Sequence, residues 1–201
     1  MTFIDLSVPL NEKTPVYPGD PETKINKAGI FGKDGYRDHY VCVGTHVGTH
    51  MDAPSHMVED GANLDTIPLE RFTGRGVYIK IDKTFDLDEV KGADIREDDI
   101  ILFHTGMSDR YHEKAYYESY PAISEEIAHY LVEKKVKIVG VDMCSPDYPP
   151  FPVHRILLGA GVLIIENLTN LKALAGKEFR IHAYPVKLAL DGAPVRVVAE
   201  L

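Results

Sequence analysis

A group of side chains that can bind metal ions lies between residues 46 and 56. Three histidines and one aspartate fall within these eleven residues: His46, His50, Asp52 and His56. All four stand at even-numbered positions, so an extended segment would place their side chains on one face. Imidazole nitrogens combined with a carboxylate oxygen suit zinc, manganese or ferrous iron. The cluster predicts a metal site, and the alternative is a set of solvated side chains on one strand face.

A straight strand cannot bring these donors to one ion. At about 3.3 Å per residue, His46 and His50 would lie roughly 13 Å apart. Gly48 can supply the required bend, because glycine adopts backbone conformations that are closed to other residues. Pro54 ends any regular element, so we expect His56 in a loop, where reactive groups are commonly presented.

Two later segments place acidic side chains after apolar strands. Asp142 and Asp147 follow the apolar residues 138–141, at the strand end where α/β proteins commonly bind ligands. Aspartate is also a frequent turn residue, and turn formation is the favoured interpretation of these two positions.

His154 and Glu166 give a stronger indication of a site. Glu166 closes the apolar residues 162–165, and His154 precedes it by twelve positions. A glutamate at the end of a buried strand is costly unless it is paired or binds a metal. Glu166 is therefore either a metal ligand or the partner of an arginine such as Arg155 or Arg180.

The elements that must position these side chains follow one another in mixed order. Ser124 and two acids open the clearest helix, which Lys134 and Lys135 close. Short helices are expected at 154–158 and 171–175. Apolar and β-branched runs predict strands at 4–8, 40–43, 76–81, 100–103, 138–141, 162–165, 179–188 and 195–200. This order indicates an α/β fold with a mixed sheet.

The whole chain has the character of a globular protein. Its 201 residues suit a single domain over 1–201, and 44% hydrophobic with 26% charged residues is an ordinary soluble composition. A net charge of -9 argues against nucleic acid or an anionic membrane as partner. The sequence shows no membrane span or signal peptide, and two cysteines make no disulfide framework, so we expect a cytoplasmic protein.

The first cluster, written H-x-G-T-H-x-D-x-P-x-H, resembles the cyclase family of metal-dependent hydrolases, which includes bacterial kynurenine formamidase and isatin hydrolase. The resemblance extends in order along nearly the whole chain. Its further residues are Tyr17-Pro18-Gly19-Asp20, Thr105-Gly106, Gly140-Val141-Asp142 with Ser145, and His154 followed by Gly161 and Glu166-Asn167-Leu168.

The resemblance implies the family's swivelling β/β/α fold and a site for two divalent ions, zinc or, alternatively, manganese. His46, His50 and Asp52 would bind one ion, and Asp52 would also reach the second. His154 would bind the second ion, and Glu166 would contribute to one or both. His56 resembles the family's catalytic acid/base. The family also implies a homodimer or a larger homo-oligomer.

Two cations that share a carboxylate can activate a bridging water and polarise a carbonyl. The expected reaction is hydrolysis of a carbon–nitrogen amide bond in a small molecule. N-formylkynurenine, an arylformamide of tryptophan catabolism, is one candidate, and Tyr17 is expected to contact the substrate. Kynurenine formamidases carry a tryptophan where this chain has Tyr17, so a cyclic amide or another carbonyl substrate remains the alternative.

A non-catalytic protein with a structural metal site is the alternative from another class. Such a site fills its coordination shell with protein ligands, whereas His56 lies beyond the ligand set. Four tyrosines form either an oligomer interface or an ordinary surface loop: Tyr111, Tyr116, Tyr117 and Tyr120.

Overall fold

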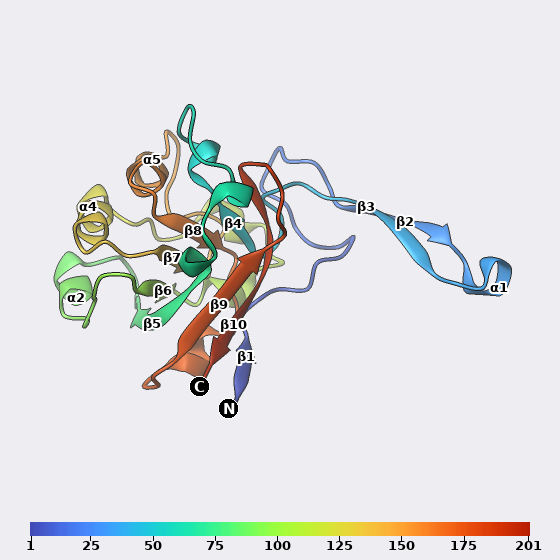
Figure 1. Ribbon diagram of the computed structural model, residues 1–201. Helices are drawn as coiled ribbons and strands as arrows, with labels where there is room; N and C mark the ends of the chain where they lie inside the picture. The colour runs from blue at the N-terminus through green and yellow to red at the C-terminus, as the bar shows by residue number, and fades with distance from the viewer.

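The computed structural model describes residues 1–201 and is built around one eight-stranded mixed sheet (Figure 1). The strand order is β1-β10-β4-β8-β7-β6-β5-β9, and β9 also pairs with β10, so the sheet closes into a barrel-like arrangement. Strands β5 to β8 run parallel, and the other pairings are antiparallel. The strands are β1 Phe3–Asp5, β4 His50–Asp52, β5 Thr73–Lys80, β6 Ile100–His104, β7 Ile138–Val141, β8 Leu163–Glu166, β9 Arg180–Pro185 and β10 Gly192–Glu200.

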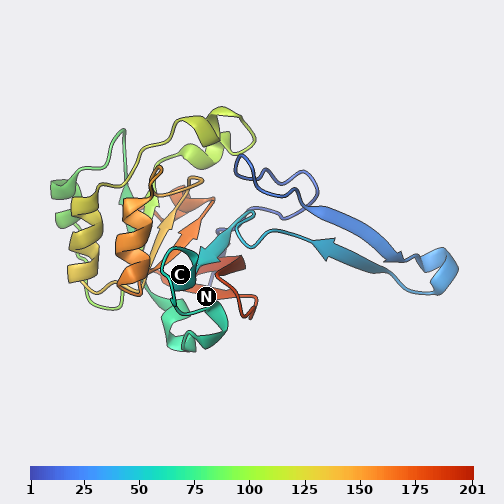
Figure 2. The ribbon, with the colours of Figure 1, turned by 90° about the horizontal axis from the view of Figure 1, so that it is seen from above.

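The parallel strands β6, β7 and β8 are apolar over most of their length, and both of their faces are buried. In β6, Ile101 and Phe103 belong to one core, and Ile100 and Leu102 belong to the other. The first core lies under the helices α2 Leu87–Lys91, α4 Glu125–Glu133 and α5 Pro152–Gly159, which cover one side of the sheet (Figure 2). The second core gathers side chains from β4, β6, β8, β9 and β10.

Helix α4 forms where the sequence predicts it. Ser124 is its N-cap, and the Ser124 hydroxyl accepts a hydrogen bond from the Ile127 backbone N–H at 3.3 Å. Ile127, Ala128 and Leu131 form its buried face. The apolar spacing and the cap therefore agree, and the helix needs no distant contact to define its start.

A two-stranded hairpin projects from the rest of the molecule (Figures 1 and 2). It consists of β2 Lys24–Gly29, α1 Phe31–Asp34 and β3 Asp38–Cys42. Every residue of β3 is exposed, and the hairpin also exposes Phe31 and Tyr36. The sequence predicted part of β3 but missed β2, because KINKAG lacks a regular apolar pattern.

Several short elements differ from expectation. His56 lies in a single 3-10 turn, Pro54–His56, and not in an irregular loop. The helix expected at 171–175 is also a 3-10 turn, Leu171–Leu174. The remaining elements are α3 Ala115–Glu118 and the 3-10 turns Leu64–Thr66, Leu69–Phe72 and Met107–Arg110. None of the helices has the length and apolar character that crossing a bilayer requires.

The tyrosine-rich segment is not an ordinary surface loop. Tyr111, Tyr116 and Tyr120 are buried in the core beneath the helices. Tyr117 is partly buried and lines a pocket. The segment is therefore a wall between the core and that pocket.

Candidate metal centre

The bend predicted at Gly48 is present. Gly48 has a φ of 64°, in the left-handed region that favours glycine, and strand β4 begins two residues later. His50 and Asp52 lie on this strand with one residue between them, so both project from the same face. Strand β4 pairs with β8 so that His50 stands directly opposite Glu166. Sheet register thus brings Glu166 to the histidine cluster.

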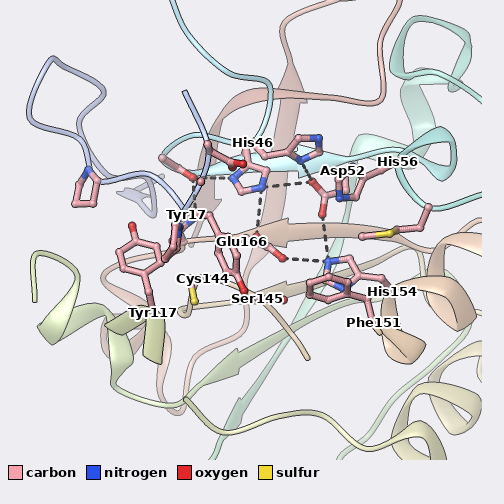
Figure 3. Close-up of a pocket in the computed structure, with 18 residues that line it drawn as sticks. Tyr17, His46, Asp52, His56, Tyr117, Cys144, Ser145, Phe151, His154 and Glu166 are labelled. Atoms are coloured by element: carbon pink, nitrogen blue, oxygen red, sulfur yellow. Dashed lines mark hydrogen bonds and ion pairs between the residues drawn. The ribbon is translucent and has the colours of Figure 1, made fainter. Parts of the chain in front are cut away.

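The Asp52 carboxylate lies at the centre of the donors (Figure 3). Its Oδ1 is 2.7 Å from His46 Nδ1 and 3.4 Å from His50 Nε2. Its Oδ2 is 3.9 Å from His154 Nε2. Glu166 completes the group, with Oε2 3.3 Å from His50 Nε2 and Oε1 3.2 Å from His154 Nε2. All five residues expected as ligands lie together, and no arginine pairs with Glu166.

Two buried atoms in this group that could bind a metal have no hydrogen-bond partner: His50 Nε2 and Asp52 Oδ2. His50 Nδ1 is 2.8 Å from the Gly48 carbonyl oxygen and donates to it. Its Nε2 therefore faces the carboxylates of Asp52 and Glu166, an arrangement that is favourable only with a cation or a proton between them. The chemistry of the donor set fits a divalent metal.

Two sets of three donors have ligand atoms within 4.8 Å of one another. One set is His46, Asp52 and His56, and the other is His50, Asp52 and Glu166. Asp52 belongs to both. His46 and His50 fall in different sets, although both face Oδ1 of Asp52. His56 lies beside His46 and Asp52, closer to the candidate ligands than the sequence indicated.

His154 is held by an acid that the sequence analysis assigned to a turn. His154 Nδ1 is 2.6 Å from Asp147 Oδ1, and the other oxygen of Asp147 accepts a hydrogen bond from the Val153 backbone N–H at 2.7 Å. Both side chains are buried. A histidine fixed at one nitrogen by a carboxylate presents the other nitrogen in a defined direction, as metal-binding histidines commonly do. Asp147 orients His154 toward Glu166.

A buried amide fixes the bend. Asn167 Nδ2 donates to the Gly48 carbonyl oxygen at 2.9 Å, and its Oδ1 accepts from the Tyr116 hydroxyl at 2.7 Å. The same Gly48 oxygen accepts from His50. This chain of hydrogen bonds holds the His50 ring in place from behind.

The charges in the cluster shift its pKa values. Burial favours neutral His46, but Asp52 and Asp191 outweigh it and raise the pKa of His46 from 6.5 to about 9. Burial also opposes charge on His154, yet Asp147 and Glu166 raise its pKa to about 10. For His56 burial is decisive and lowers the pKa. His46 and His154 therefore hold protons that a metal ion would have to displace.

A cavity of about 450 Å³ opens beside the donors (Figure 3). Tyr17 and Tyr117 form an aromatic wall, with ring centroids 6.2 Å apart and planes at 82°. Phe151 lines the cavity and packs edge-to-face on His154, with centroids 5.5 Å apart. A planar small molecule can therefore contact aromatic rings while its polar group lies against the donors.

The hydroxyl and thiol groups near the site show no arrangement for covalent catalysis. Burial raises the pKa of the Cys144 thiol to about 12, which keeps it protonated at neutral pH. The Ser145 hydroxyl donates to the Asp147 carbonyl oxygen at 2.8 Å. The Ser55 hydroxyl donates to Asn63 Oδ1 at 2.7 Å. Neither serine contacts a base, so activated water is the nucleophile that suits this site.

Sequence reasoning missed two acids that contact the histidines, Asp147 and Asp191. Asp191 Oδ2 is 2.8 Å from His46 Nε2 and 3.3 Å from His56 Nδ1. Both aspartates have a neighbour typical of turns, Pro146 or Gly192, so the sequence favoured a role in turn formation. The only available signal was an acid placed at a strand boundary.

Comparison with known proteins first defines a class. A predicted metal-dependent hydrolase from Bacillus stearothermophilus has the same fold, with a TM-score of 0.82 and 32% identity over 98% of this chain and 97% of that one. Isatin hydrolase A from Labrenzia aggregata, bound to benzyl benzoate, has a TM-score of 0.88 and 26% identity over 98% and 93% of the two chains. This chain is a metal-dependent hydrolase.

The family follows from the sequence match. The profile of the "Putative cyclase" family matches residues 4–148. The kynurenine formamidase of Geobacillus thermodenitrificans is 30% identical over 96% of this chain and 95% of that protein. The chain belongs to the cyclase family, which confirms the predicted family and its α/β fold.

Proposed function

We propose that this protein hydrolyses the carbon–nitrogen amide bond of a small aromatic substrate, using two divalent ions held around Asp52. The observation that carries the proposal is the position of the Asp52 carboxylate, which has one oxygen facing His46 and His50 and the other facing His154. A carboxylate placed between two groups of nitrogen donors suits two cations better than one.

The two oxygens of Asp52 divide the donors. His46 Nδ1 and His50 Nε2 lie on the Oδ1 side and would hold the first ion, and His154 Nε2 lies on the Oδ2 side and would hold the second. Glu166 has an oxygen near His50 and another near His154, so it would contribute to both. Zinc is the proposed metal, and manganese is the alternative because it accepts the same donors.

Divalent ions in these positions lower the pKa of a coordinated water and polarise a substrate carbonyl. Hydrolysis then forms a carbon–oxygen bond, breaks the carbon–nitrogen bond and requires a proton on the leaving nitrogen. His56 Nε2 accepts the proton lost by the attacking water and passes it to the leaving nitrogen, because Nδ1 contacts Asp191 and leaves Nε2 free. The lowered pKa of His56 suits this role, since it keeps Nε2 unprotonated before the attack and makes the ring a ready donor once it has taken that proton.

Arylformamides are the proposed substrate class, with N-formylkynurenine as the first compound to test. The aromatic wall of Tyr17 and Tyr117 supports an aromatic substrate, and the relatives include a kynurenine formamidase. A cyclic aromatic amide is the second candidate, since isatin hydrolase A shares the fold.

The proposal is tested by removing and restoring metal. Chelator-treated protein should lose hydrolysis of N-formylkynurenine, formanilide or isatin and regain it with zinc or manganese. Bound metal is counted in parallel by elemental analysis. A structural metal site predicts instead that the metal-replete protein hydrolyses none of these compounds while chelation lowers its melting temperature.

We also propose that the protein assembles with a second copy of itself through the hairpin of residues 24–42. An isolated two-stranded hairpin has marginal stability in water, and this one exposes Phe31, Tyr36 and Tyr40. The hairpin carries four basic and two acidic residues, whereas the whole chain has a net charge of -9. The hairpin is therefore complementary in charge to the body of another copy.

Light scattering of the full chain tests this assembly. We expect a dimer or larger species that dissociates when Phe31 and Tyr36 are both changed to serine. Leu69→Ser, at an exposed leucine outside the hairpin, is the control and should leave the mass unchanged. A monomeric wild-type protein at micromolar concentration would contradict the proposal.

A further inference from the structure

Asp191 is a partly exposed acidic side chain, and one of its two oxygens, Oδ2, contacts two histidines that line the cavity. The distances are 2.8 Å to His46 Nε2 and 3.3 Å to His56 Nδ1. The two imidazole rings lie against each other, with centroids 3.9 Å apart and planes inclined by 35°. One carboxylate therefore links a proposed metal ligand to the proposed acid/base.

The backbone holds Asp191 in this position. Its carbonyl oxygen accepts a hydrogen bond from the Ala53 N–H at 2.8 Å, next to Asp52 in the chain. The next residue, Gly192, pairs with Asp52 across strands β10 and β4. A Cβ at Gly192 would lie 2.7 Å from His46 Cε1, so glycine is required for the ring to fit there. The Asp191 carboxylate and the space left by Gly192 together hold the His46 ring in place.

A carboxylate only accepts hydrogen bonds, so both nitrogens that contact it must carry protons. His46 then donates from Nε2 and turns Nδ1 toward Asp52, and His56 donates from Nδ1 and leaves Nε2 for the cavity. This assignment is the same whether His46 binds a metal through Nδ1 or donates a second proton to Asp52.

We propose that Asp191 is a positioning residue that fixes the tautomer and ring orientation of His46 and His56 together. Its effect on turnover rests on the proposed hydrolase function, whereas its effect on the two rings does not. His46 is 19% exposed and Asp191 is 37% exposed, so water competes for these contacts and the charged acceptor has to outweigh it. Asp191 therefore acts through the two histidines and does not itself contact the reacting atoms.

Nitrogen-15 NMR of the histidine rings tests the proposal directly. The zinc-loaded full chain is labelled at histidine and studied at mildly alkaline pH, and the His56 signals are those lost in His56→Ala. We expect His56 Nδ1 to carry the proton in the wild type. In Asp191→Ala, we expect the two His56 tautomers to mix. In Asp191→Asn, the two N–H donors select the amide oxygen, so the wild-type tautomer should return.

Kinetics and a matched control complete the test. Partners of metal-binding histidines commonly contribute about 10–100-fold, so Asp191→Ala should lower kcat by that factor with little change in KM. Asp191→Asn should lose less. Glu200→Gln is the control, because Glu200 Oε2 contacts His182 Nε2 at 2.8 Å away from the cavity. It should alter only the His182 signals and leave kcat unchanged.

The possible results separate the two proposals. An unchanged His56 tautomer in Asp191→Ala overturns the role of Asp191, whatever the activity. An altered tautomer in a protein that hydrolyses no amide supports Asp191 and contradicts the proposed function. If Asp191→Asn loses the wild-type tautomer as completely as Asp191→Ala, that result also counts against Asp191. The amide retains an oxygen that can accept from both histidines, so the tautomer should have been kept.

Discussion

Two histidines on different sides of the donor cluster are each paired with an aspartate, but in different surroundings. His154 and Asp147 are both buried, with side chains 4% exposed, and both oxygens of Asp147 are engaged. His46 and Asp191 are 19% and 37% exposed, and one oxygen of Asp191 serves His56 as well. The first pair is closed to solvent, and the second is partly open to it.

This difference separates an anchoring role from a role in turnover. A buried pair leaves an uncompensated group when one partner is removed, whereas water can replace a partner in an exposed pair. We therefore expect changes at the buried pair to act on stability and metal retention. Changes at the open pair should act on the chemistry that involves His56.

The largest effect is expected at His56. His56→Ala should lower kcat by roughly 10²–10⁴-fold, because a proton donor to the leaving nitrogen is lost, while most metal is retained. His50→Ala is the comparison, and it should lower metal content and activity together. Elemental analysis and steady-state kinetics measure both. If His56→Ala empties the site, His56 is a ligand of the first ion, as its nearness to His46 and Asp52 would allow.

The next effect contrasts the two aspartates. In metal-free protein, Asp147→Ala should lower the free energy of unfolding by about 3–5 kcal/mol, the usual cost of breaking a buried pair. Asp191→Ala should cost about 1 kcal/mol or less, as for exposed pairs. Urea denaturation of both variants measures the difference. Equal losses would show that burial does not distinguish the two pairs.

Metal binding should depend on pH in a direction set by the same histidines. In the metal-free protein the pKa of His46 is raised to about 9 and that of His154 to about 10, so both are protonated at neutral pH. Metal must displace these protons, and its affinity should rise with pH by about tenfold per unit for each proton displaced. Calorimetry in buffers of different ionisation enthalpy counts the protons, and release of none would contradict the shifts.

Stability without metal should follow the opposite trend. A histidine whose pKa is raised on folding contributes stability that is fully present below the unfolded value of 6.5. That contribution is lost as pH rises through about 9 and 10. Thermal melts of the metal-free protein should therefore decline over this interval, and a melting temperature that rises there would be the contrary result.

A smaller loss of stability than that of Asp147→Ala is expected at Gly192, which leaves space for the His46 ring. Gly192→Ala should displace the ring and cost about 1–3 kcal/mol, as inserted methyl groups usually do. Gly159→Ala is the matched control, because a Cβ there meets no atom within 4 Å. Thermal melts of the two variants give the comparison, and equal behaviour would mean that His46 can move without cost.

Local patterns in the sequence predicted those elements whose conformation is set by residues close to them in the chain. The apolar runs of β6, β7 and β8 and the cap of α4 emerged at or near their observed bounds. The bend at Gly48 followed from the distance between His46 and His50. The hairpin did not, because its strands lack the apolar alternation of a strand that packs on a core.

The parts that escaped prediction depend on contacts between distant residues. Closure of the sheet rests on the pairing of β9 with both β10 and β5, and the sequence indicated these strands but not the return of β9 to β5. Asp147 and Asp191 have neighbours typical of turns, and only the fold reveals that both face histidines. The cluster of 46–56 was visible because a single segment carries its donors, whereas its supporting acids come from separate segments.

The most direct test of the account is a crystal structure of the zinc-loaded protein with anomalous scattering measured at the zinc edge. The account predicts two peaks on either side of the Asp52 carboxylate, with donor distances of about 2.0–2.2 Å. One peak should contact His46 and His50, and the other should contact His154 and Glu166. A single peak, or two peaks of which neither contacts Asp52, would contradict the shared-carboxylate centre from which the proposed chemistry is derived.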